Sequence, residues 1–417
     1  MSVAPPTPSS DVSSELDQGV DRSRVGERKF VAYADYVAPP LTAEVATRRL
    51  FGWLWRQFDP PENAETFVAP ELLRVASRRR LNQIAAPPAC GPLLDDLDET
   101  FASWLADADR DSTRQLVLLP PGDANGLLRA WADETELCML TPPTREELFT
   151  QAGLEHVDRQ VGHLREAESV CVVPQLEDWF LRCSGGLACI RRLLRGLADR
   201  ERPVIVGCNT WAWNLLVKAV RADLYFKTPL TFAPFSQHRL ADWFEELSEH
   251  GAGIVFRMAS TGQTIIDPDD ESASPAGYFE KLAAESFGIP WVAWSRWRKS
   301  LRHTREQTEL PAPPDNGPDP TTERRRTLWV EPMGELMLPL GYETPAAFYL
   351  HALVIHGKLT AGELDRVCPS VGDEDILQGL MNVGMVQQTD EHWSIEPAAY
   401  PDIRRNLGSA GFDEPRL

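Results

Sequence analysis

Positive charge is scarce in this chain of 417 residues, which carries 42 Lys and Arg against 62 Asp and Glu. The formal net charge of -20 excludes a broad electrostatic attraction to nucleic acid or to an anionic membrane, but it does not exclude a local basic patch. Long apolar runs are also missing, because none reaches the roughly 18 residues that a membrane helix requires. The sequence therefore predicts a protein without a membrane span.

Cysteine is sparse, and its spacing matches no metal motif. The seven cysteines include no Cys-x-x-Cys pair, and the closest two are Cys183 and Cys189. No apolar segment follows basic residues near residue 1, so we expect no secretory signal. An odd number of unpatterned cysteines favours reduced thiols and a cytoplasmic location. His351 and His356 lie five residues apart, which does not place them on one helix face, so we expect no metal site.

Two polar segments divide the chain. Residues 1–27 are nearly free of large apolar side chains and predict a disordered tail, because they cannot bury enough surface to offset the loss of conformational entropy. Residues 304–326 are rich in proline and charge and predict a linker between separately folded parts. The block between these segments is too long for one typical hydrophobic core, so we expect more than one domain in it.

An alternation of short apolar runs and helical stretches indicates a parallel α/β sheet. The apolar runs are "QLVLLP", "ELCML", "SVCVVP", "PVIVGC" and "PLTFAPF", and the stretches between them have helical spacing. Further helices are predicted upstream, over residues 44–56, 71–84 and 93–109. Ligands of parallel sheets bind outside the carboxyl ends of the strands, so the loops that follow these runs are the candidate site.

The loop after the first run, "LPPGDANG", has the outline of a phosphate-binding loop. A working loop reads G-x-x-x-x-G-K-[ST]: its backbone amides cradle phosphates, its lysine reaches the terminal ones, and its hydroxyl binds magnesium. The alignment starts at Gly122 and Asp123. Ala124 then replaces the second glycine, Asn125 the lysine and Gly126 the hydroxyl residue. Asp123 also brings a negative charge to where a phosphate would sit. An ordinary Pro-Gly turn that caps a helix is the alternative interpretation.

The third strand lacks the carboxylates of an ATPase. Such strands end in an acidic residue that holds magnesium, often followed by a catalytic glutamate. Pro174 and Gln175 occupy these positions. Glu177 and Asp178 come two residues later, on the following turn, where they are typical of helix N-terminal charges.

The later segments complete a resemblance to a known family. "VIVGCNTW" places Asn209 after the fourth strand, "LTFAPFSQHRLADWFEEL" follows as a strand and a helix capped by Ser236, and residues 278–302 form two helices around a glycine turn. In this order the segments resemble the core of an AAA+/STAND ATPase, in which Asn209 would lie beside the γ-phosphate. The resemblance implies an N-terminal helical segment over 28–109, a P-loop NTPase-like core over 110–250 and a helical lid over 251–303.

The resemblance does not extend to the catalytic residues, because the lysine, both magnesium ligands and the catalytic glutamate are all missing. We therefore predict a degenerate site that does not hydrolyse ATP and has no cofactor beyond weak ATP or ADP binding. Its residues would be Gly122, Asp123, Ala124, Asn125, Gly126 and Asn209. Arg296 and Arg298 of the lid are expected on a solvated face, with a nucleotide contact as the alternative.

Residues 327–417 resemble a winged helix-turn-helix domain. A nearly all-apolar helix, a second helix with Thr360 and Glu363 spaced as a capping box, a third amphipathic helix and a hairpin follow one another. The third helix would read DNA, but it opens with Asp373, Glu374 and Asp375. These carboxylates would repel phosphates, so we expect a protein partner, and DNA binding is not expected.

Three functions follow from these observations. The first is a non-catalytic scaffold or regulatory protein that acts through protein contacts, as a monomer or an oligomer. The second is a nucleotide-binding switch without hydrolysis, and the third is a DNA-binding transcription regulator.

Overall fold

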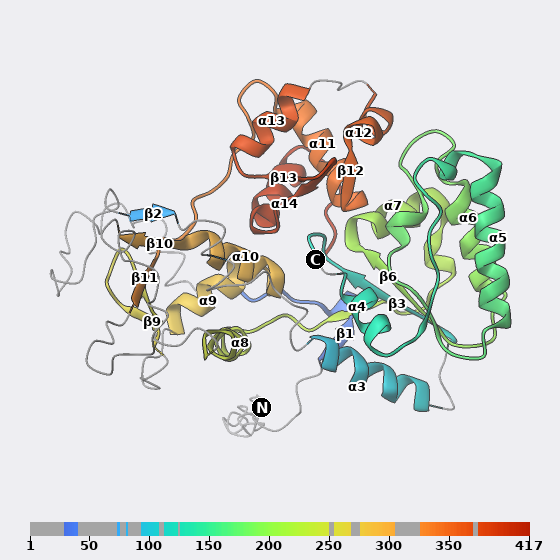
Figure 1. Cartoon of the computed structure of the whole chain (residues 1–417), viewed down its shortest axis with the longest axis horizontal. Helices are drawn as coiled ribbons and strands as arrows, with labels where there is room; N and C mark the ends of the chain where they lie inside the picture. Colours follow the sequence, from blue (N-terminus) through green and yellow to red (C-terminus); the bar gives the residue numbers. More distant parts are fainter. Residues whose placement is uncertain are drawn as a thin grey trace, which may run out of the picture.

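The computed structural model describes residues 29–40, 73–75, 81, 93–107, 112–123, 126–249, 254–267, 276–304, 326–369 and 374–417. Figure 1 shows a sheet with its helices on the right, a smaller sheet beside α9 and α10 on the left, and a C-terminal domain above them. The predicted tail over residues 1–27 and the predicted helix over 44–56 lie outside the described residues.

The larger sheet contains all five predicted core strands, which run parallel, in the order β7-β3-β6-β5-β4. Most residues of β3, β5, β6 and β7 are buried, which explains the continuous apolar runs in the sequence, whereas β4 at the edge is partly buried. A sixth strand, β1, was not predicted; it pairs antiparallel with β7 at the edge. The bounds are β1 Phe30–Ala32, β3 Arg114–Leu119, β4 Cys138–Met139, β5 Cys171–Val173, β6 Val204–Asn209 and β7 Leu230–Phe232.

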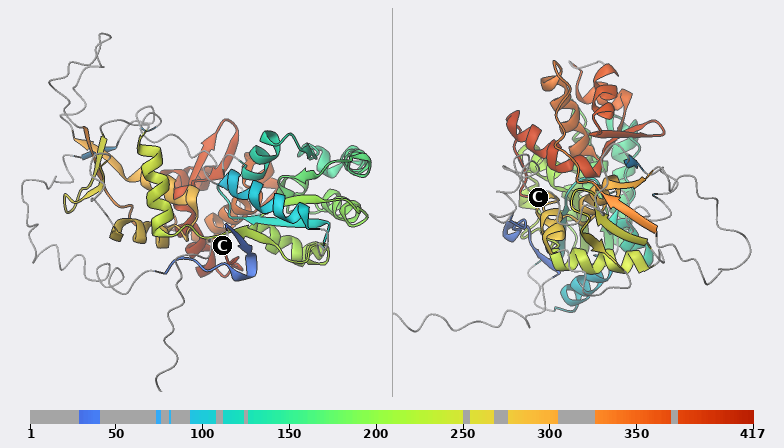
Figure 2. Two further views of the ribbon diagram at one scale, coloured as in Figure 1. Left: turned by 90° about the horizontal axis from the view of Figure 1, so that it is seen from below. Right: turned by 90° about the vertical axis from the view of Figure 1, so that its left-hand side faces the viewer.

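Helices cover both faces of this sheet (Figure 2). They are α3 Leu93–Ala106, α4 Leu127–Glu134, α5 Gln151–Glu166, α6 Ala188–Ala198 and α7 Thr210–Val220, whereas α8 Gln237–Glu249 packs against the lid. In α6, Leu193 and Leu197 are fully buried whereas Arg191 and Arg195 are exposed. Such a division at helical spacing anchors the helix by its apolar stripe. The predicted cap of α8 is present, because the backbone N–H of Arg239 donates to the Ser236 hydroxyl.

A second, five-stranded sheet corrects the expected all-helical lid. Its order is β2-β10-β11-β8-β9, with bounds β2 Leu73–Val75, β8 Ile254–Met258, β9 Thr264–Ile266, β10 Leu301–Thr304 and β11 Arg326–Val330. The helix predicted over 71–84 is wrong at residues 73–75, and the helical lid predicted over 251–303 is wrong at β8 and β9. β-Branched residues favour strands here, and pairing with β10 and β11 stabilises them. Residues 327–330, assigned to the winged-helix domain, belong to this sheet.

The two predicted lid helices are present as α9 Ala276–Glu285 and α10 Pro290–Ser300. Gly288 lies in the turn between them with a φ of 74°, and a Cβ there would lie 2.7 Å from Pro234. Only glycine fits this close approach of the lid to the core. Trp294 and Trp297 of α10 pack against Phe244 of α8, with ring centroids 5.0 and 5.1 Å apart.

The C-terminal domain has the three helices and the hairpin that were predicted, together with β12 and α14, which were not. Its helices are α11 Glu343–His356, α12 Ala361–Val367, α13 Glu374–Asn382 and α14 Tyr400–Ser409, and its strands are β12 Lys358–Thr360, β13 Val386–Thr389 and β14 His392–Ile395. The capping box of Thr360 and Glu363 is present at the start of α12. The hairpin β13–β14 turns at Asp390, whose φ is 54°. The fold is thus a P-loop NTPase-like parallel sheet, a lid that combines two helices with a second sheet, and a winged-helix domain.

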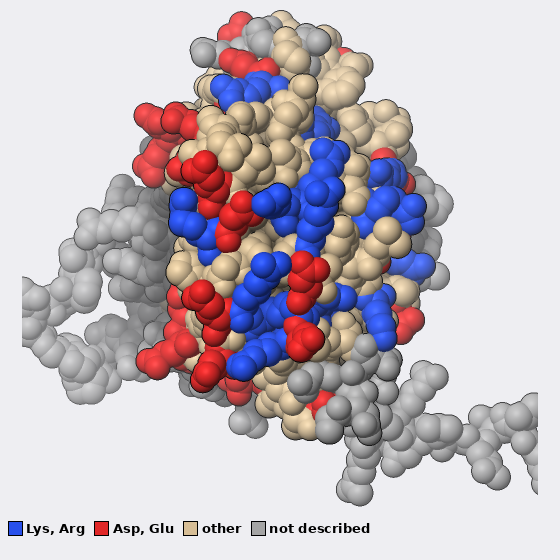
Figure 3. All heavy atoms as spheres, turned by 90° about the vertical axis from the view of Figure 1, so that its right-hand side faces the viewer, with Lys and Arg blue, Asp and Glu red and all other residues tan. Residues whose placement is uncertain are grey.

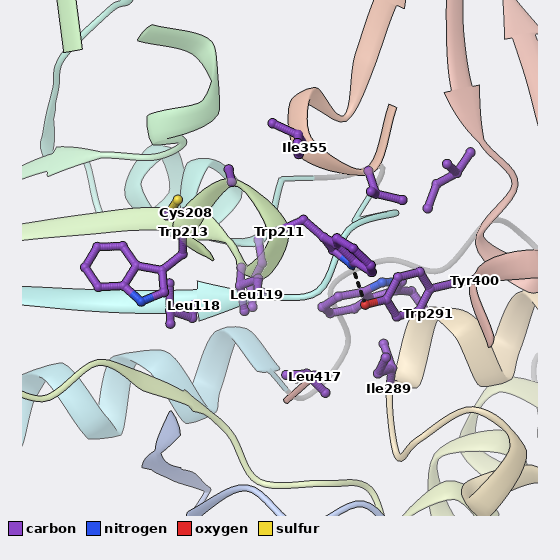
Figure 4. Close-up of a cluster of buried hydrophobic side chains, with 14 of the residues drawn as sticks. Leu118, Leu119, Cys208, Trp211, Trp213, Ile289, Trp291, Ile355, Tyr400 and Leu417 are labelled. Carbon is purple, nitrogen blue, oxygen red and sulfur yellow. Dashed lines mark hydrogen bonds between the residues drawn. The ribbon is translucent and has the colours of Figure 1, made fainter. Parts of the chain in front are cut away.

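One apolar cluster runs through the core, the lid and the winged-helix domain without interruption. Figure 4 shows its central seam, where Trp211 of α7 donates to the Tyr400 hydroxyl of α14 at 3.1 Å. The Thr210 hydroxyl donates to the backbone oxygen of buried Leu417 at 2.8 Å. These contacts join the winged-helix domain to the carboxyl end of the sheet. No helix in the described part of the chain has the length and apolar character needed to cross a bilayer.

Candidate nucleotide site

The loop between β3 and α4 is arranged around the carboxylate of Asp123. Gly122 and Gly126 adopt φ values of 91° and 63°, which glycine reaches without strain. Between them, Asp123 Oδ1 accepts the backbone N–H of Gly126 at 3.1 Å, and its Oδ2 accepts that of Leu127 at 2.6 Å. Ala124 and Asn125 were also assigned to this site, but they lie outside the described residues.

This carboxylate takes the place of a bound anion. Backbone N–H groups at a helix N-terminus attract phosphates because they have no partner within the helix and carry the positive end of its dipole. Here the first N–H groups of α4 point to Asp123. A phosphate would have to displace a covalently tethered, charged acceptor to reach them. The N–H groups of this loop are therefore bonded to a side chain of the loop itself.

Glu177 supplies a second acidic side chain to the site. It is 6% exposed, and its Oε2 accepts the backbone N–H of Asn209 at 3.1 Å. Burial, aided by the nearby charge of Asp178, raises the pKa of Glu177 to about 8. This carboxyl is therefore mostly protonated near neutral pH and is a poor ligand for magnesium.

The structure separates Glu177 from its neighbour Asp178, although the sequence grouped them as helix N-terminal charges. Both lie in a 3-10 turn over Leu176–Trp179. Asp178 faces outward and pairs with Arg145 at 3.2 Å, whereas Glu177 faces the site. Pro174 and Gln175 line the end of β5 as predicted. Sequence reasoning missed the inward position of Glu177, because its partner Asn209 lies on another strand.

Asn209 begins α7 and connects it to the winged-helix domain. Its Oδ1 accepts the backbone N–H of Ala212 at 2.7 Å, which caps the helix. Its Nδ2 donates to the backbone oxygen of Ile355, near the end of α11, also at 2.7 Å. The side chain is 5% exposed. Both ends of the amide that would face a γ-phosphate are therefore bonded within the protein.

The lid and the winged-helix domain cover what is left of the site. Trp291 of α10 donates to the backbone oxygen of Pro121 at 3.3 Å, and a Cβ on Gly122 would lie 3.4 Å from Pro397. The remaining cavity has a volume of about 60 Å³. That volume holds about two waters, whereas ligand pockets usually measure several hundred Å³. No Lys or Arg lines this cavity among the described residues. The lining residues are Leu119 to Asp123, Gly126, Leu127, Leu128, Pro174, Gln175, Glu177, Cys208, Asn209 and Gly357.

Arg296 corrects the expected solvated lid face. It is 8% exposed, donates to the backbone oxygen of Ala398 at 3.1 Å, and pairs with Glu285 at 3.2 Å. This guanidinium joins α10 to the winged-helix domain. Arg298 is partly buried, so it does not lie on a fully solvated face either.

His351 and His356 meet at Arg182 despite their spacing on α11. His351 Nδ1 lies 2.6 Å from the Arg182 guanidinium, and His356 Nε2 accepts the backbone N–H of Arg182 at 3.2 Å. Burial and nearby arginine charge lower the pKa of His351 to about 3, so its ring is neutral. The pair belongs to the contact between core and winged-helix domain. Among the described residues, no group of three His, Cys, Asp or Glu could hold a metal ion.

Comparison with solved structures finds similar chains at low sequence identity. The chain is similar to the Aeropyrum pernix ORC1 protein in complex with DNA, at 16% identity and a TM-score of 0.35, over 83% of this chain and 99% of that one. It is similar to CDC6P from Pyrobaculum aerophilum at 12% identity and a TM-score of 0.31, over 84% and 100%. It is also similar to the Aeropyrum pernix ORC2 protein (ADPNP-ADP complexes), at 9% identity and a TM-score of 0.35, over 84% of this chain and 98% of that one. No protein-family model and no curated protein sequence matches the chain.

Proposed function

We propose that this chain is a non-hydrolysing protein built on the AAA+ ATPase fold, and that it acts as a scaffold or regulatory protein through protein contacts. The observation that carries the proposal is the carboxylate of Asp123, which accepts the N–H groups that a phosphate would need. The cavity of about 60 Å³ and the absence of Lys and Arg from its described lining support it.

Hydrolysis of ATP needs a charge clamp that these residues do not supply. Phosphoryl transfer is catalysed by positioning and by cations that neutralise charge on the phosphates. Asp123 is acidic, and Pro174 and Gln175 replace the magnesium ligands. A site of this composition raises the energy of the transition state that an ATPase must lower.

An ATPase assay on the full-length protein tests the proposal. With millimolar ATP and magnesium, phosphate release is expected to equal that of a buffer blank. The protein is passed through a final size-exclusion step, so that a contaminating ATPase separates from it. Turnover that follows the protein peak and disappears in Gly122→Val would contradict the proposal, provided that circular dichroism shows the variant to be folded.

The second candidate, a nucleotide switch without hydrolysis, requires the site to open first. Pro397 and Gly357 would have to move away and Asp123 would have to leave its two N–H partners, which lowers the apparent affinity by the fraction of open molecules. Titration of a fluorescent ATP analogue distinguishes the two candidates. We expect no saturable binding by the wild type. Saturable binding that becomes tighter in Asp123→Ala would favour the switch.

The third candidate, a DNA-binding regulator, is disfavoured by the charge of the reading helix. The sequence of α13, EDILQGLMN, contains no Lys or Arg, Asp375 is exposed near its start, and the wing turns at Asp390 and Glu391. Figure 3 shows Lys and Arg side chains interspersed with Asp and Glu on the face that carries α5 and α6. Full-length protein should not retard a DNA duplex even at about 50 mM salt, where phosphate contacts are strong. Sequence-selective retardation would restore the regulator.

A further inference from the structure

The connection between β11 and α11 exposes large apolar side chains on the winged-helix side of the molecule. We name residues 331–342 the strap. Leu340 is 91% exposed, Met337 67% and Tyr342 43%. Apolar side chains gathered on one short surface segment are a recognised mark of a contact site, whereas single exposed ones need no explanation.

The strap is held in place by the rest of the domain. The backbone oxygen of Leu336 accepts the Asn406 side chain of α14 at 3.4 Å, and the backbone N–H of Tyr342 donates to Pro339 at 3.2 Å. Pro339 packs on α13, since a Cβ on Gly379 would lie 3.4 Å from its ring. The exposed side chains are thus presented by an anchored backbone, which lowers the entropy lost when a partner binds.

One carboxylate lies within the strap, and others lie beside it. Glu335 lies within it, half exposed, at 3.8 Å from Arg405. Glu343 follows it and accepts the backbone N–H of Gly341 at 3.1 Å. Backbone N–H groups lower the pKa of Glu343, so this carboxyl is ionised at neutral pH. Asp375 of α13 is exposed and lies one turn before Gly379, on the side of the helix that carries the strap.

We propose that the strap and the start of α13 form a docking surface for a cationic amphipathic helix of another protein. Its apolar stripe would cover Met337, Leu340 and Tyr342, and its Lys or Arg side chains would face the bordering carboxylates. An amphipathic helix carries an apolar stripe with charges beside it, which matches an apolar strip flanked by acids. Nucleic acid does not fit, because its phosphates would meet these carboxylates. The inference rests on the proposed function and names the partner chemistry of the scaffold.

A binding titration with the full-length protein tests the docking surface. The probe is a fluorescent synthetic peptide with leucines at helical spacing on one face and lysines on the other. We expect saturable binding that weakens at least about tenfold when Met337→Ser and Leu340→Ser are combined, because the apolar contact is lost without a change in charge. The control Leu224→Ser, at an exposed leucine of the core (71%), should bind as the wild type does. A leucine–glutamate peptide of the same design should not bind.

Two results would overturn the docking surface. One is equal affinity of the wild type and the double serine variant, and the other is no saturable binding at all. Displacement of the peptide by duplex DNA would assign the surface to nucleic acid instead. The ATPase assay is a separate readout, so phosphate release would refute the proposed function while leaving the peptide result to be judged on its own.

Discussion

Asp123 and Glu177 are two acidic residues that line one small cavity and accept N–H groups from different elements. Asp123 accepts two backbone N–H groups at the start of α4. Glu177 is 6% exposed and has a raised pKa. Each therefore allows a test of its own by a single substitution.

Replacement of Asp123 should loosen the start of α4. Asp123→Ala removes both acceptors and should lower the free energy of unfolding by about 1–2 kcal/mol, as loss of a helix cap does. Asp123→Asn keeps one acceptor without the charge and should lose less. Urea denaturation followed by circular dichroism measures both. Identical midpoints for the wild type and the alanine variant would show that this carboxylate does not hold the loop.

Glu177 should make the protein less stable as the pH rises. The folded chain keeps the Glu177 proton up to about pH 8, whereas the unfolded chain releases it near 4.5, the ordinary pKa of a glutamate side chain. Stability from this group is complete below the unfolded pKa and is lost as pH rises through the folded one, by up to ~1.4 kcal/mol per pH unit. Glu177→Gln keeps an acceptor for Asn209 and removes the titration. Urea midpoints of this variant should fall less than those of the wild type between about pH 5 and about pH 8; parallel curves would contradict the assignment.

For single residues, the sequence showed which residue types are missing from the site, but it did not show where each side chain lies. The missing lysine and magnesium ligands were readable, since each motif position names a residue type. The inward position of Glu177 was not, because it depends on Asn209, which the fold brings close from another strand. Arg296 was misread for the same reason: its partner Ala398 lies in a different domain.

Among the elements, the strands β10 and β11 lie at the two ends of the predicted linker and belong to one sheet. They pair antiparallel, with Leu301 opposite Val330, and β11 also pairs with β8 along its whole length. If a specific protease site is inserted between residues 305 and 325, the two fragments should stay together after cleavage, because the sheet and the apolar cluster still join them. Size-exclusion chromatography without denaturant is the measurement. Separate elution would instead support two independently folded pieces.

Three of the elements that the sequence missed, β1, β2 and β9, are short and lie at sheet edges, whereas β8, β10 and β11 were missed inside the second sheet. β1, β2 and β9 contain three residues each, and alternation over three residues is too brief to distinguish a strand. The five core strands were predicted because burial on both faces makes them continuously apolar. The first three helices and the hairpin of the winged-helix domain were predicted because apolar periodicity, a capping box and a hairpin turn mark them, whereas β12 and α14 were not predicted.

For the whole molecule, we expect the core, the lid and the winged-helix domain to unfold together, because the winged-helix domain is in contact with the sheet. Chains with several domains often unfold in steps, but here one apolar cluster includes residues from the core, the lid and α14. Trp211 also donates to Tyr400 across the seam. Thermal unfolding followed by far-ultraviolet circular dichroism and by tryptophan fluorescence should therefore give coincident transitions.

The seam can be weakened at one atom to test this coupling. Tyr400→Phe removes the hydroxyl and leaves the buried N–H of Trp211 without its acceptor, which should cost about 1–3 kcal/mol. Because the domains share one core, both transitions should move to lower temperature together. If only one of them moved, or if the wild type already showed two steps, the winged-helix domain would be an independent folding unit. The winged-helix domain could then move away from the candidate site without unfolding the core, and the nucleotide switch would become the better supported function.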